Sequence, residues 1–241
     1  MREKLIVALD VPNLATAERL VDRLADFVGA FKVGKELFVA EGPDVLRAIA
    51  ERGSRVFLDL KFHDIPNTVA RAVGAAAAQG VWMLNVHASG GPAMLQAARS
   101  AAENVALVKN RERTIVIGVT VLTSLDAADL AAVGLAGKPD EAALRLAELA
   151  HANGLDGVVA SAQEAAAIKK ACGSDFLIVA PGIRPAAAEL GDQKRVMTPS
   201  KAIAAGADYL VVGRPITQAP LPEAAAEAIV EEMEAAARGV A

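Results

Sequence analysis

Cysteine is almost missing from this sequence, since Cys172 is the only one among 241 residues. No internal disulfide can form, and no cluster of cysteines can bind zinc. Aromatic residues make up only 3% of the chain, which argues against stacking platforms for single-stranded nucleic acid. The formal net charge is −4, so there is no basic excess to attract a nucleic acid partner. A small phosphorylated ligand needs only one or two local cations and stays compatible with this composition.

Long uncharged apolar runs are also missing from the start of the chain. The apolar stretch in MREKLIVALDV is too short for a signal peptide or a membrane span, and it is interrupted by Asp10. We therefore expect a cytoplasmic protein without a membrane partner. Hydrophobic residues make up 54% of the chain and charged residues 22%, which favours a large buried core over disorder.

Two kinds of segment alternate along the whole chain. Short apolar, β-branched runs predict strands at Leu5–Val11, Phe31–Gly34, Arg55–Phe62, Met83–Ala88, Thr114–Leu122, Gly157–Ser161, Phe176–Ile183 and Tyr209–Ile216. Stretches of helical period predict helices near 14–27, 43–52, 66–79, 92–104, 139–153, 163–171, 199–205 and 222–238.

This alternation places the chain in the α/β class. Nearly continuous apolar strands indicate a parallel sheet that is covered by helices. A (β/α)8 TIM barrel needs about 250 residues, so we predict one barrel that forms a single domain over residues 1–241. A doubly wound open sheet is the structural alternative.

Charged residues interrupt the apolar pattern at the ends of the predicted strands, where the active sites of such barrels form. The first strand run ends near Asp10, and the second contains Lys32. The third carries Asp59 and Lys61, whose spacing of two directs both side chains to one side of the strand. Two opposite charges directed into a barrel are costly unless they are paired and used.

Each charge also has a purely structural interpretation. Asp10 would cap the helix near 14, Lys32 would extend its ammonium group to solvent, and the third-strand charges would form a structural ion pair. Asp64 follows that strand and fits the N-cap of the next helix, with Pro66 in its first turn. The complete set is harder to explain structurally than any single member.

The last two strands also end in residues of functional interest. Gly213 and Arg214 follow the eighth strand, where TIM barrels often bind phosphate. Glycine permits close approach of the backbone, and the guanidinium group binds phosphate in a bidentate manner. The segment from Arg184 to Thr198 is long for a compact domain, so it is either a lid or a surface insertion.

Two histidines lie near these strand ends. His63 and His87 are each interpreted either as a base or as a structural residue. They form no metal site without a cluster of carboxylates, and Lys32 and Lys61 would repel a nearby cation. We expect no metal and no cofactor.

The third-strand motif resembles a known family. Asp59-Leu-Lys61-Phe-His-Asp64-Ile-Pro-Asn67-Thr68 is similar to the signature of the orotidine 5'-monophosphate decarboxylases. The resemblance extends over the whole chain and includes the segments around Asp10, Lys32, Thr123, Arg184, Gln193 and Gly213-Arg214. It implies a cofactor-free (β/α)8 barrel that converts orotidine 5'-monophosphate (OMP) to UMP and CO2, the last step of pyrimidine nucleotide synthesis.

The resemblance also implies a role for each catalytic position. Lys61 donates a proton to C6 of the pyrimidine, and Asp59 lies beside the substrate carboxylate. Lys32, Asp59, Lys61 and Asp64 form an array of alternating charge. The family is homodimeric, and the resemblance implies that Asp64 and Thr68 are contributed across the dimer interface.

The remaining positions are implied to bind other parts of the substrate. Asp10 and Lys32 contact the ribose hydroxyl groups, and Thr123 contacts the base. The 5'-phosphate group is held by Gln193, Gly213 and Arg214. Arg184 starts the lid and belongs to the substrate-binding set.

Two other functions remain open. A magnesium-dependent sugar-phosphate decarboxylase of the same suprafamily would carry an acidic residue in place of Lys32 and would lack the Ile-Pro-Asn-Thr continuation. A non-catalytic barrel that binds a nucleotide phosphate would not need the interior Asp59 and Lys61. Inhibition by EDTA would distinguish the first, and UMP binding without turnover would support the second.

Overall fold

The computed structural model describes residues 1–135, 137–185 and 196–239, and its strands close into one parallel barrel. Every strand pairs in parallel with the next one along the chain, and β1 pairs with β8 to complete the ring. The strands are β1 (Leu5–Ala8), β2 (Ala30–Gly34), β3 (Val56–Phe62), β4 (Met83–His87), β5 (Ile115–Val119), β6 (Gly157–Val159), β7 (Leu177–Ala180) and β8 (Tyr209–Val212). The predicted TIM barrel is confirmed. Each predicted strand run overlaps one of these strands, although β2 begins one residue before the predicted run, at Ala30.

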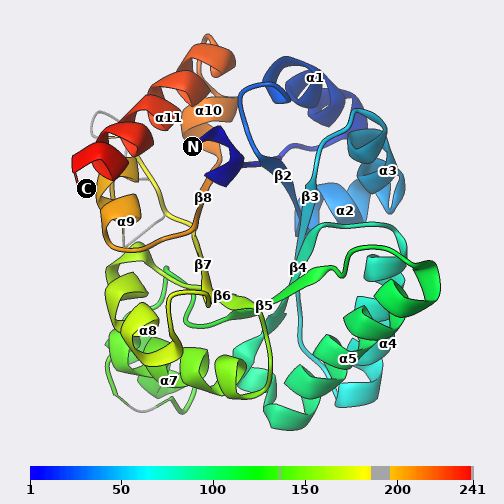
Figure 1. The fold of residues 1–241 in the computed structure, drawn as a ribbon, viewed down its shortest axis with the longest axis vertical. Coiled ribbons are helices and arrows are strands. Elements are labelled where there is room, and N and C mark those ends of the chain that lie inside the picture. The colour runs from blue at the N-terminus through cyan, green and yellow to red at the C-terminus, as the bar shows by residue number, and fades with distance from the viewer. Residues whose placement is uncertain (136, 186–195, 240–241) are drawn as a thin grey trace.

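The helices form a ring outside the strands (Figure 1). They are α1 (Leu14–Leu24), α2 (Lys35–Glu41), α3 (Asp44–Glu51), α4 (Pro66–Ala78), α5 (Pro92–Lys109), α6 (Ala127–Ala132), α7 (Pro139–Ala152), α8 (Ala165–Cys172), α9 (Pro199–Ala204), α10 (Arg214–Thr217) and α11 (Pro222–Gly239). Proline lies in the first turn of α4, α5, α7 and α9, where its missing N–H group costs no hydrogen bond. Within the described residues, none of these helices is long and apolar enough to cross a membrane.

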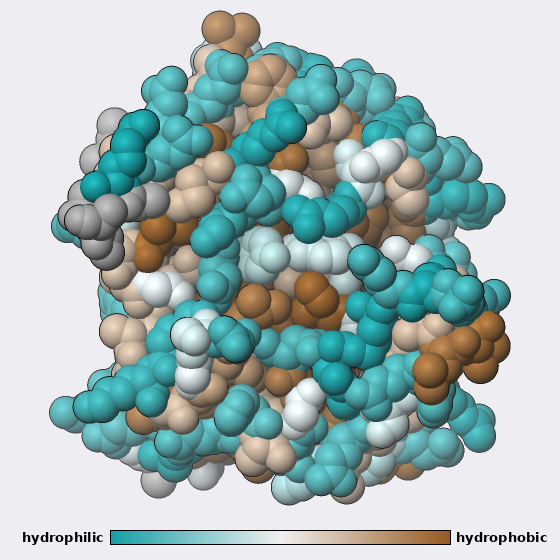
Figure 2. All heavy atoms as spheres, in the orientation of Figure 1, coloured by the Kyte–Doolittle hydropathy of each residue, from teal (hydrophilic) through white to brown (hydrophobic). Residues whose placement is uncertain are grey.

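Strand alternation divides the buried side chains into two cores. One core fills the interior of the barrel with inward-pointing residues of different strands, such as Ile6, Phe57, Met83 and Val179. A larger core packs the outer faces of the strands against the helices. Hydrophilic side chains cover most of the surrounding rim in Figure 2, while hydrophobic ones gather near the centre of that face. Along β3, residues at even spacing from Phe57, beginning with Asp59, therefore point into the barrel.

The structure corrects three details of the sequence interpretation. Strand β8 ends at Val212 instead of Ile216, because the chain turns at Gly213 and Pro215 lies in the first turn of α10. Asp64 is not the N-cap of α4, since Ile65 occupies that position and Asp64 accepts the hydrogen bond of the Ile65 N–H group at 2.6 Å. The short helices α2, α6 and α10 were not expected.

Candidate active site

A cavity of 540 Å³ opens at the carboxyl ends of the strands. This volume suits a small-molecule ligand. Residues from seven of the eight strands or from the segments that follow them line it: Ala8, Asp10, Lys32, Phe57, Asp59, Lys61, Val119, Val121, Leu122, Thr123, Ser124, Val159, Ala160, Pro181, Gly182, Arg184, Val211, Gly213, Arg214 and Gln218. Eight of the predicted site residues are therefore brought together in one cavity.

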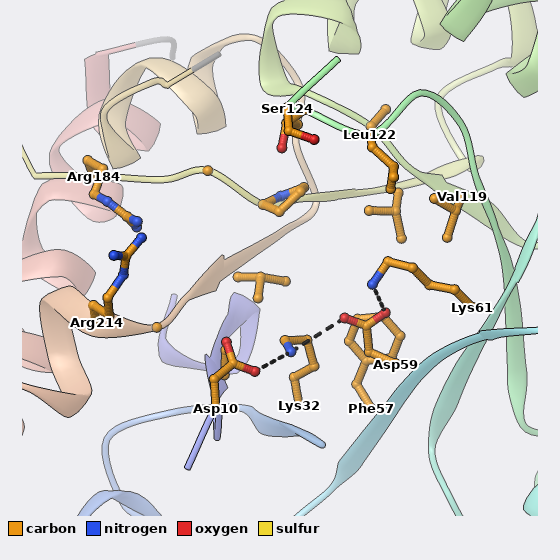
Figure 3. Close-up of a pocket in the computed structure, with 18 of the residues that line it drawn as sticks. Asp10, Lys32, Phe57, Asp59, Lys61, Val119, Leu122, Ser124, Arg184 and Arg214 are labelled. Atoms are coloured by element: carbon orange, nitrogen blue, oxygen red, sulfur yellow. Dashed lines mark hydrogen bonds and ion pairs between the residues drawn. The ribbon is translucent and has the colours of Figure 1, made fainter. Parts of the chain in front are cut away.

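Four charged side chains of alternating sign form a continuous row along one wall (Figure 3). Lys32 Nζ lies 3.0 Å from Asp10 Oδ1 and 3.4 Å from Asp59 Oδ2. Lys61 Nζ lies 2.6 Å from Asp59 Oδ1. The row joins three neighbouring strands, because Asp10 follows β1, Lys32 belongs to β2, and Asp59 and Lys61 belong to β3.

Asp59 is the most enclosed carboxylate of this row, with 8% of its surface exposed. Burial alone would raise its pKa, because it removes water from the charged form. The positive charges of Lys32 and Lys61, with hydrogen bonds from Lys61 and Asn85, outweigh burial and hold the pKa of Asp59 below its ordinary value. Asp59 is consequently a carboxylate throughout the neutral pH range.

Lys61 has an unusual backbone conformation, with φ at +55°. Lysine rarely adopts this left-handed region, since its Cβ crowds the carbonyl oxygen. The β3–β4 pairing is irregular at this point: Leu58 pairs with Leu84, and Phe62 pairs with Val86. Three residues of β3 are therefore accommodated opposite one residue of β4, which is a bulge. The bulge redirects the Lys61 side chain toward the cavity and the Asp59 carboxylate.

Two guanidinium groups lie at the other end of the cavity from Lys61. Figure 3 shows the side chains of Arg184 and Arg214 pointing toward one another. Arg184 follows β7, is 9% exposed and donates to the Ile183 carbonyl oxygen at 3.1 Å. Arg214 begins α10, directly after Gly213. Two cations at one end of a cavity suit an anionic group such as a phosphate.

The wall contributed by the β5 end combines apolar and hydroxyl-bearing side chains. Val119 and Leu122 lie near Lys61, with Ser124 further toward the arginines (Figure 3). Thr123 also lines the cavity and is 9% exposed. The cavity therefore has a charged wall and a partly apolar wall, with paired cations at one end.

Two predicted site residues do not line this cavity, and a third lies outside the described residues. Asp64 and Thr68 are exposed and do not line it. Gln193 lies outside the described residues, as does most of the predicted lid segment from Arg184 to Thr198. Sequence reasoning missed Asn85, a buried polar residue of β4 that contacts both Asp59 and the Lys61 backbone. The only signal for it was an asparagine within an otherwise apolar strand.

The two histidines lie side by side and do not line the cavity. The ring centroids of His63 and His87 are 5.3 Å apart. Burial lowers the pKa of His87 to about 4, with further contributions from His63, Lys61 and Lys35 and an opposing one from Asp59. His87 is therefore neutral at physiological pH. Among the described residues, no three His, Cys, Asp or Glu side chains are grouped so that they could hold a metal ion.

The sequence matches the model of one protein family over residues 3–229, and this family is described as "Orotidine 5'-phosphate decarboxylase / HUMPS family". The chain belongs to that family. The family resemblance of the third-strand motif is thereby confirmed.

Members of the orotidine 5'-phosphate decarboxylase / HUMPS family resemble the chain over almost its whole length. The orotidine 5'-phosphate decarboxylase of Moorella thermoacetica is 58% identical over 97% of this chain and 93% of its own length. That of Halorhodospira halophila is 58% identical over 97% of both chains. The crystal structure of orotidine 5'-phosphate decarboxylase from Lactobacillus acidophilus superposes with a TM-score of 0.84 at 38% identity, covering 95% of this chain and 98% of that one.

Proposed function

We propose that the protein decarboxylates orotidine 5'-phosphate to UMP and CO2 in this cavity. One observation carries the proposal: the buried Asp59 carboxylate binds the Lys61 ammonium group at 2.6 Å inside a cavity whose other end holds two arginines. The relatives named orotidine 5'-phosphate decarboxylase, at 58% identity, support the same function.

The distribution of charge in the cavity favours one orientation of the bound substrate. Its 5'-phosphate binds between Arg184 and Arg214, beside Gly213, where the backbone leaves room for it. The ribose hydroxyl groups contact Asp10 and Lys32 in the middle of the charged row. The pyrimidine then lies against the partly apolar wall with Thr123, and its C6 carboxylate reaches Asp59 and Lys61.

Lys61 supplies the proton in the reaction. When the bond between C6 and the carboxylate carbon breaks, CO2 leaves and the electron pair stays on C6. A fixed ammonium group at this point stabilises the developing negative charge without reorganising solvent. The Lys61 ammonium group then transfers one proton to C6, which gives UMP, and the amine regains a proton from solvent.

Asp59 has two functions in this scheme. Its negative charge binds and orients the Lys61 ammonium group before the reaction, with Oδ1 and Nζ 2.6 Å apart. It also lies beside the substrate carboxylate, where repulsion favours the departure of CO2 as a neutral molecule. Lys32 binds the second oxygen of Asp59 and limits the repulsion that substrate binding has to overcome.

The phosphate group contributes through binding energy that is used far from the reacting bond. Contacts at Arg184 and Arg214 would supply this energy and hold the pyrimidine against Asp59 and Lys61. A substrate without the phosphate would therefore lose turnover rate as well as affinity.

The active form is a homodimer. Asp64 and Thr68 are exposed at the start of α4, and the exposed Ile65 lies between them with 66% of its surface accessible. An exposed apolar side chain beside an exposed carboxylate is suited to contact with a second copy. We propose that Asp64 completes the charged row of the partner subunit, next to the ammonium group equivalent to Lys61, and that Thr68 contacts the substrate bound there.

The test is the loss of ultraviolet absorbance of orotidine 5'-phosphate after addition of the EDTA-treated protein. Rapid loss with UMP as the product supports the proposal and excludes dependence on an exchangeable divalent metal. If absorbance is unchanged while UMP still binds, the decarboxylase proposal is wrong. Sugar phosphates with Mg²⁺ would then be assayed, because the alternative decarboxylase uses that metal.

A further inference from the structure

Asn85 contacts both residues of the central ion pair from a position outside the cavity lining. It belongs to β4, has 1% of its surface exposed and does not line the cavity. Its Nδ2 donates to Asp59 Oδ1 at 2.7 Å, and its Oδ1 accepts from the backbone N–H of Lys61 at 2.8 Å. One side chain therefore uses both ends of its amide on the two residues that the proposed reaction needs most.

The irregular strand pairing explains why these contacts exist. Between the paired positions of β3 and β4, Asn85 is the single β4 residue opposite Asp59, Leu60 and Lys61. A bulge leaves backbone groups without their ladder partners, and a buried N–H group without a partner is costly. The Asn85 side chain provides the acceptor that regular pairing would have supplied to Lys61.

The charge of Asp59 fixes the orientation of the amide. A carboxylate only accepts hydrogen bonds, so the NH2 end of Asn85 has to face Asp59 and its oxygen has to face the Lys61 N–H group. Because both Asn85 and Asp59 are buried, no water replaces these bonds easily. The amide thereby links the direction of the Asp59 carboxylate to the left-handed backbone of Lys61.

We propose that Asn85 is a positioning residue, which holds the Lys61 ammonium group and the Asp59 carboxylate in the geometry required for proton transfer to the substrate. This inference rests on the proposed decarboxylase function. It predicts that Asn85 affects the rate of the chemical step and leaves substrate affinity nearly unchanged, since its amide lies outside the cavity lining.

Two variants separate the hydrogen bonds. Asn85→Leu keeps the volume of the side chain and removes both bonds, and we expect kcat to fall roughly 10- to 100-fold, as for the loss of a hydrogen bond to a charged group. The KM for orotidine 5'-phosphate and the Kd for UMP should change less than about threefold. The acid limb of the kcat profile should move to higher pH, because Asp59 loses a donor that stabilises its charge.

Asn85→Asp keeps the acceptor for the Lys61 N–H group but loses the donor to Asp59 while its new carboxyl group is ionised. Protonation of that group restores the donor, and repulsion from Asp59 raises the pKa at which it protonates. The kcat of this variant, relative to the unaltered protein, should therefore rise between pH 8 and pH 6. The same ratio for Asn85→Leu should not rise.

Thr114→Val is the matched control, since it also removes one buried side-chain hydrogen bond, from Thr114 Oγ1 to the Val81 carbonyl oxygen at 2.8 Å. Thr114 precedes β5, at the end of the barrel away from the cavity. Its kcat should remain within about twofold of the unaltered protein even if the midpoint of unfolding falls.

Crystal structures of the unaltered protein and Asn85→Leu test the geometry independently of turnover. We expect the variant to lose the positive φ of Lys61 or its Nζ contact with Asp59. The proposal is overturned if Asn85→Leu keeps both the positive φ of Lys61 and the Nζ contact with Asp59, or if its kcat stays within about twofold of the unaltered protein. It is also overturned if kcat and UMP affinity of this variant fall in parallel with its stability, because that result indicates a structural role only. If the unaltered protein does not turn over orotidine 5'-phosphate, the decarboxylase proposal fails, and the structures alone decide the role of Asn85. If Asn85→Leu does not fold, the pH dependence of kcat in Asn85→Asp tests the proposal, and no rise in its relative kcat between pH 8 and pH 6 overturns it.

Discussion

Lys61 Nζ and Asp59 Oδ1 lie 2.6 Å apart although both residues belong to the same strand, separated by a single leucine. Residues at this spacing on a regular strand point to one side, but their side chains run parallel to each other. The left-handed backbone at Lys61 turns its side chain back toward Asp59. The contact is thus a product of the bulge in β3 as much as of the two charges.

Replacement of Lys61 by alanine should remove turnover and keep the binding pocket. We expect kcat to fall by at least roughly 10³-fold, because both the fixed positive charge and the proton donor are lost. Binding of UMP, measured by calorimetry, should change little. Lys170→Ala, on the exposed surface of α8, is the matched control and should retain full activity. Turnover by Lys61→Ala above about a tenth of the normal rate would contradict the assignment of Lys61 as proton donor.

Because Gly34 has no side chain, it leaves room for the side chains of Asp10 and Lys32 in the charged row. A Cβ atom at this position would lie 3.1 Å from both Asp10 Oδ1 and Lys32 Nζ. The backbone φ of −90° suits alanine, so Gly34→Ala introduces crowding without backbone strain. We expect kcat/KM to fall on the order of 10-fold, since small displacements of positioned groups reduce turnover strongly.

The control for this substitution is Gly74→Ala in α4, where an added Cβ meets no atom within 4 Å. That variant should keep its activity and gain slightly in stability, because alanine favours the helix. Equal activity of the two variants in a steady-state assay would show that Gly34 does not maintain the geometry of Asp10 and Lys32.

Mixing two inactive variants tests whether the active site is shared between subunits. Lys61→Ala and Asp64→Asn homodimers should each be nearly inactive. A heterodimer of the two contains one site with both an intact Lys61 and an intact Asp64. Random exchange in an equal mixture should therefore restore about a quarter of the normal activity per site. Failure of mixing to restore activity, with subunit exchange verified by mass spectrometry, would place Asp64 in the site of its own chain or outside the site.

The stability of the fold should depend on pH through His87. The folded pKa of about 4 lies below the value of 6.5 for a free histidine, so the unfolded chain binds more protons between these two values. The free energy of unfolding should fall as pH decreases from about 6.5 to about 4, with a loss up to roughly 2 kcal/mol after allowance for the partial exposure of the ring.

Thermal unfolding at pH 7 and pH 5 measures this dependence. His87→Asn should lose less stability between these two values than the unaltered protein does. The range lies above the ordinary pKa of aspartate, so the contribution of Asp59, which is lost only in stronger acid, does not interfere. An identical loss in both proteins would show that His87 is not the group responsible.

The barrel itself could be predicted from the sequence because its buried strands consist of short apolar runs. Parallel strands covered on both faces, such as Leu177–Ala180, contain only apolar residues, and charges at their ends stand out. The same contrast predicted that Asp59 and Lys61 would point into one cavity. The ends of strands were harder to place, since the predicted eighth strand extends to Ile216, whereas Gly213 forms a turn and Arg214–Thr217 forms a short helix.

The missed features depend on contacts between distant residues. No local pattern marks the left-handed backbone of Lys61, which arises from a register shift between two strands. Asn85 was visible as a polar residue within a strand, yet its partners became clear only once β3 and β4 were placed side by side. Asp64 illustrates the opposite case, since its position before Pro66 favoured a helix cap that the structure does not contain.

The left-handed backbone of Lys61 also bears on how this protein would respond to selection or redesign for heat resistance alone. A non-glycine residue at φ +55° costs the fold on the order of 1 kcal/mol, which glycine at the same position would largely recover. The most heat-resistant sequence for this backbone would therefore replace the lysine to which we assign proton transfer. Lys61 persists at this position only where turnover, and not folding alone, is selected.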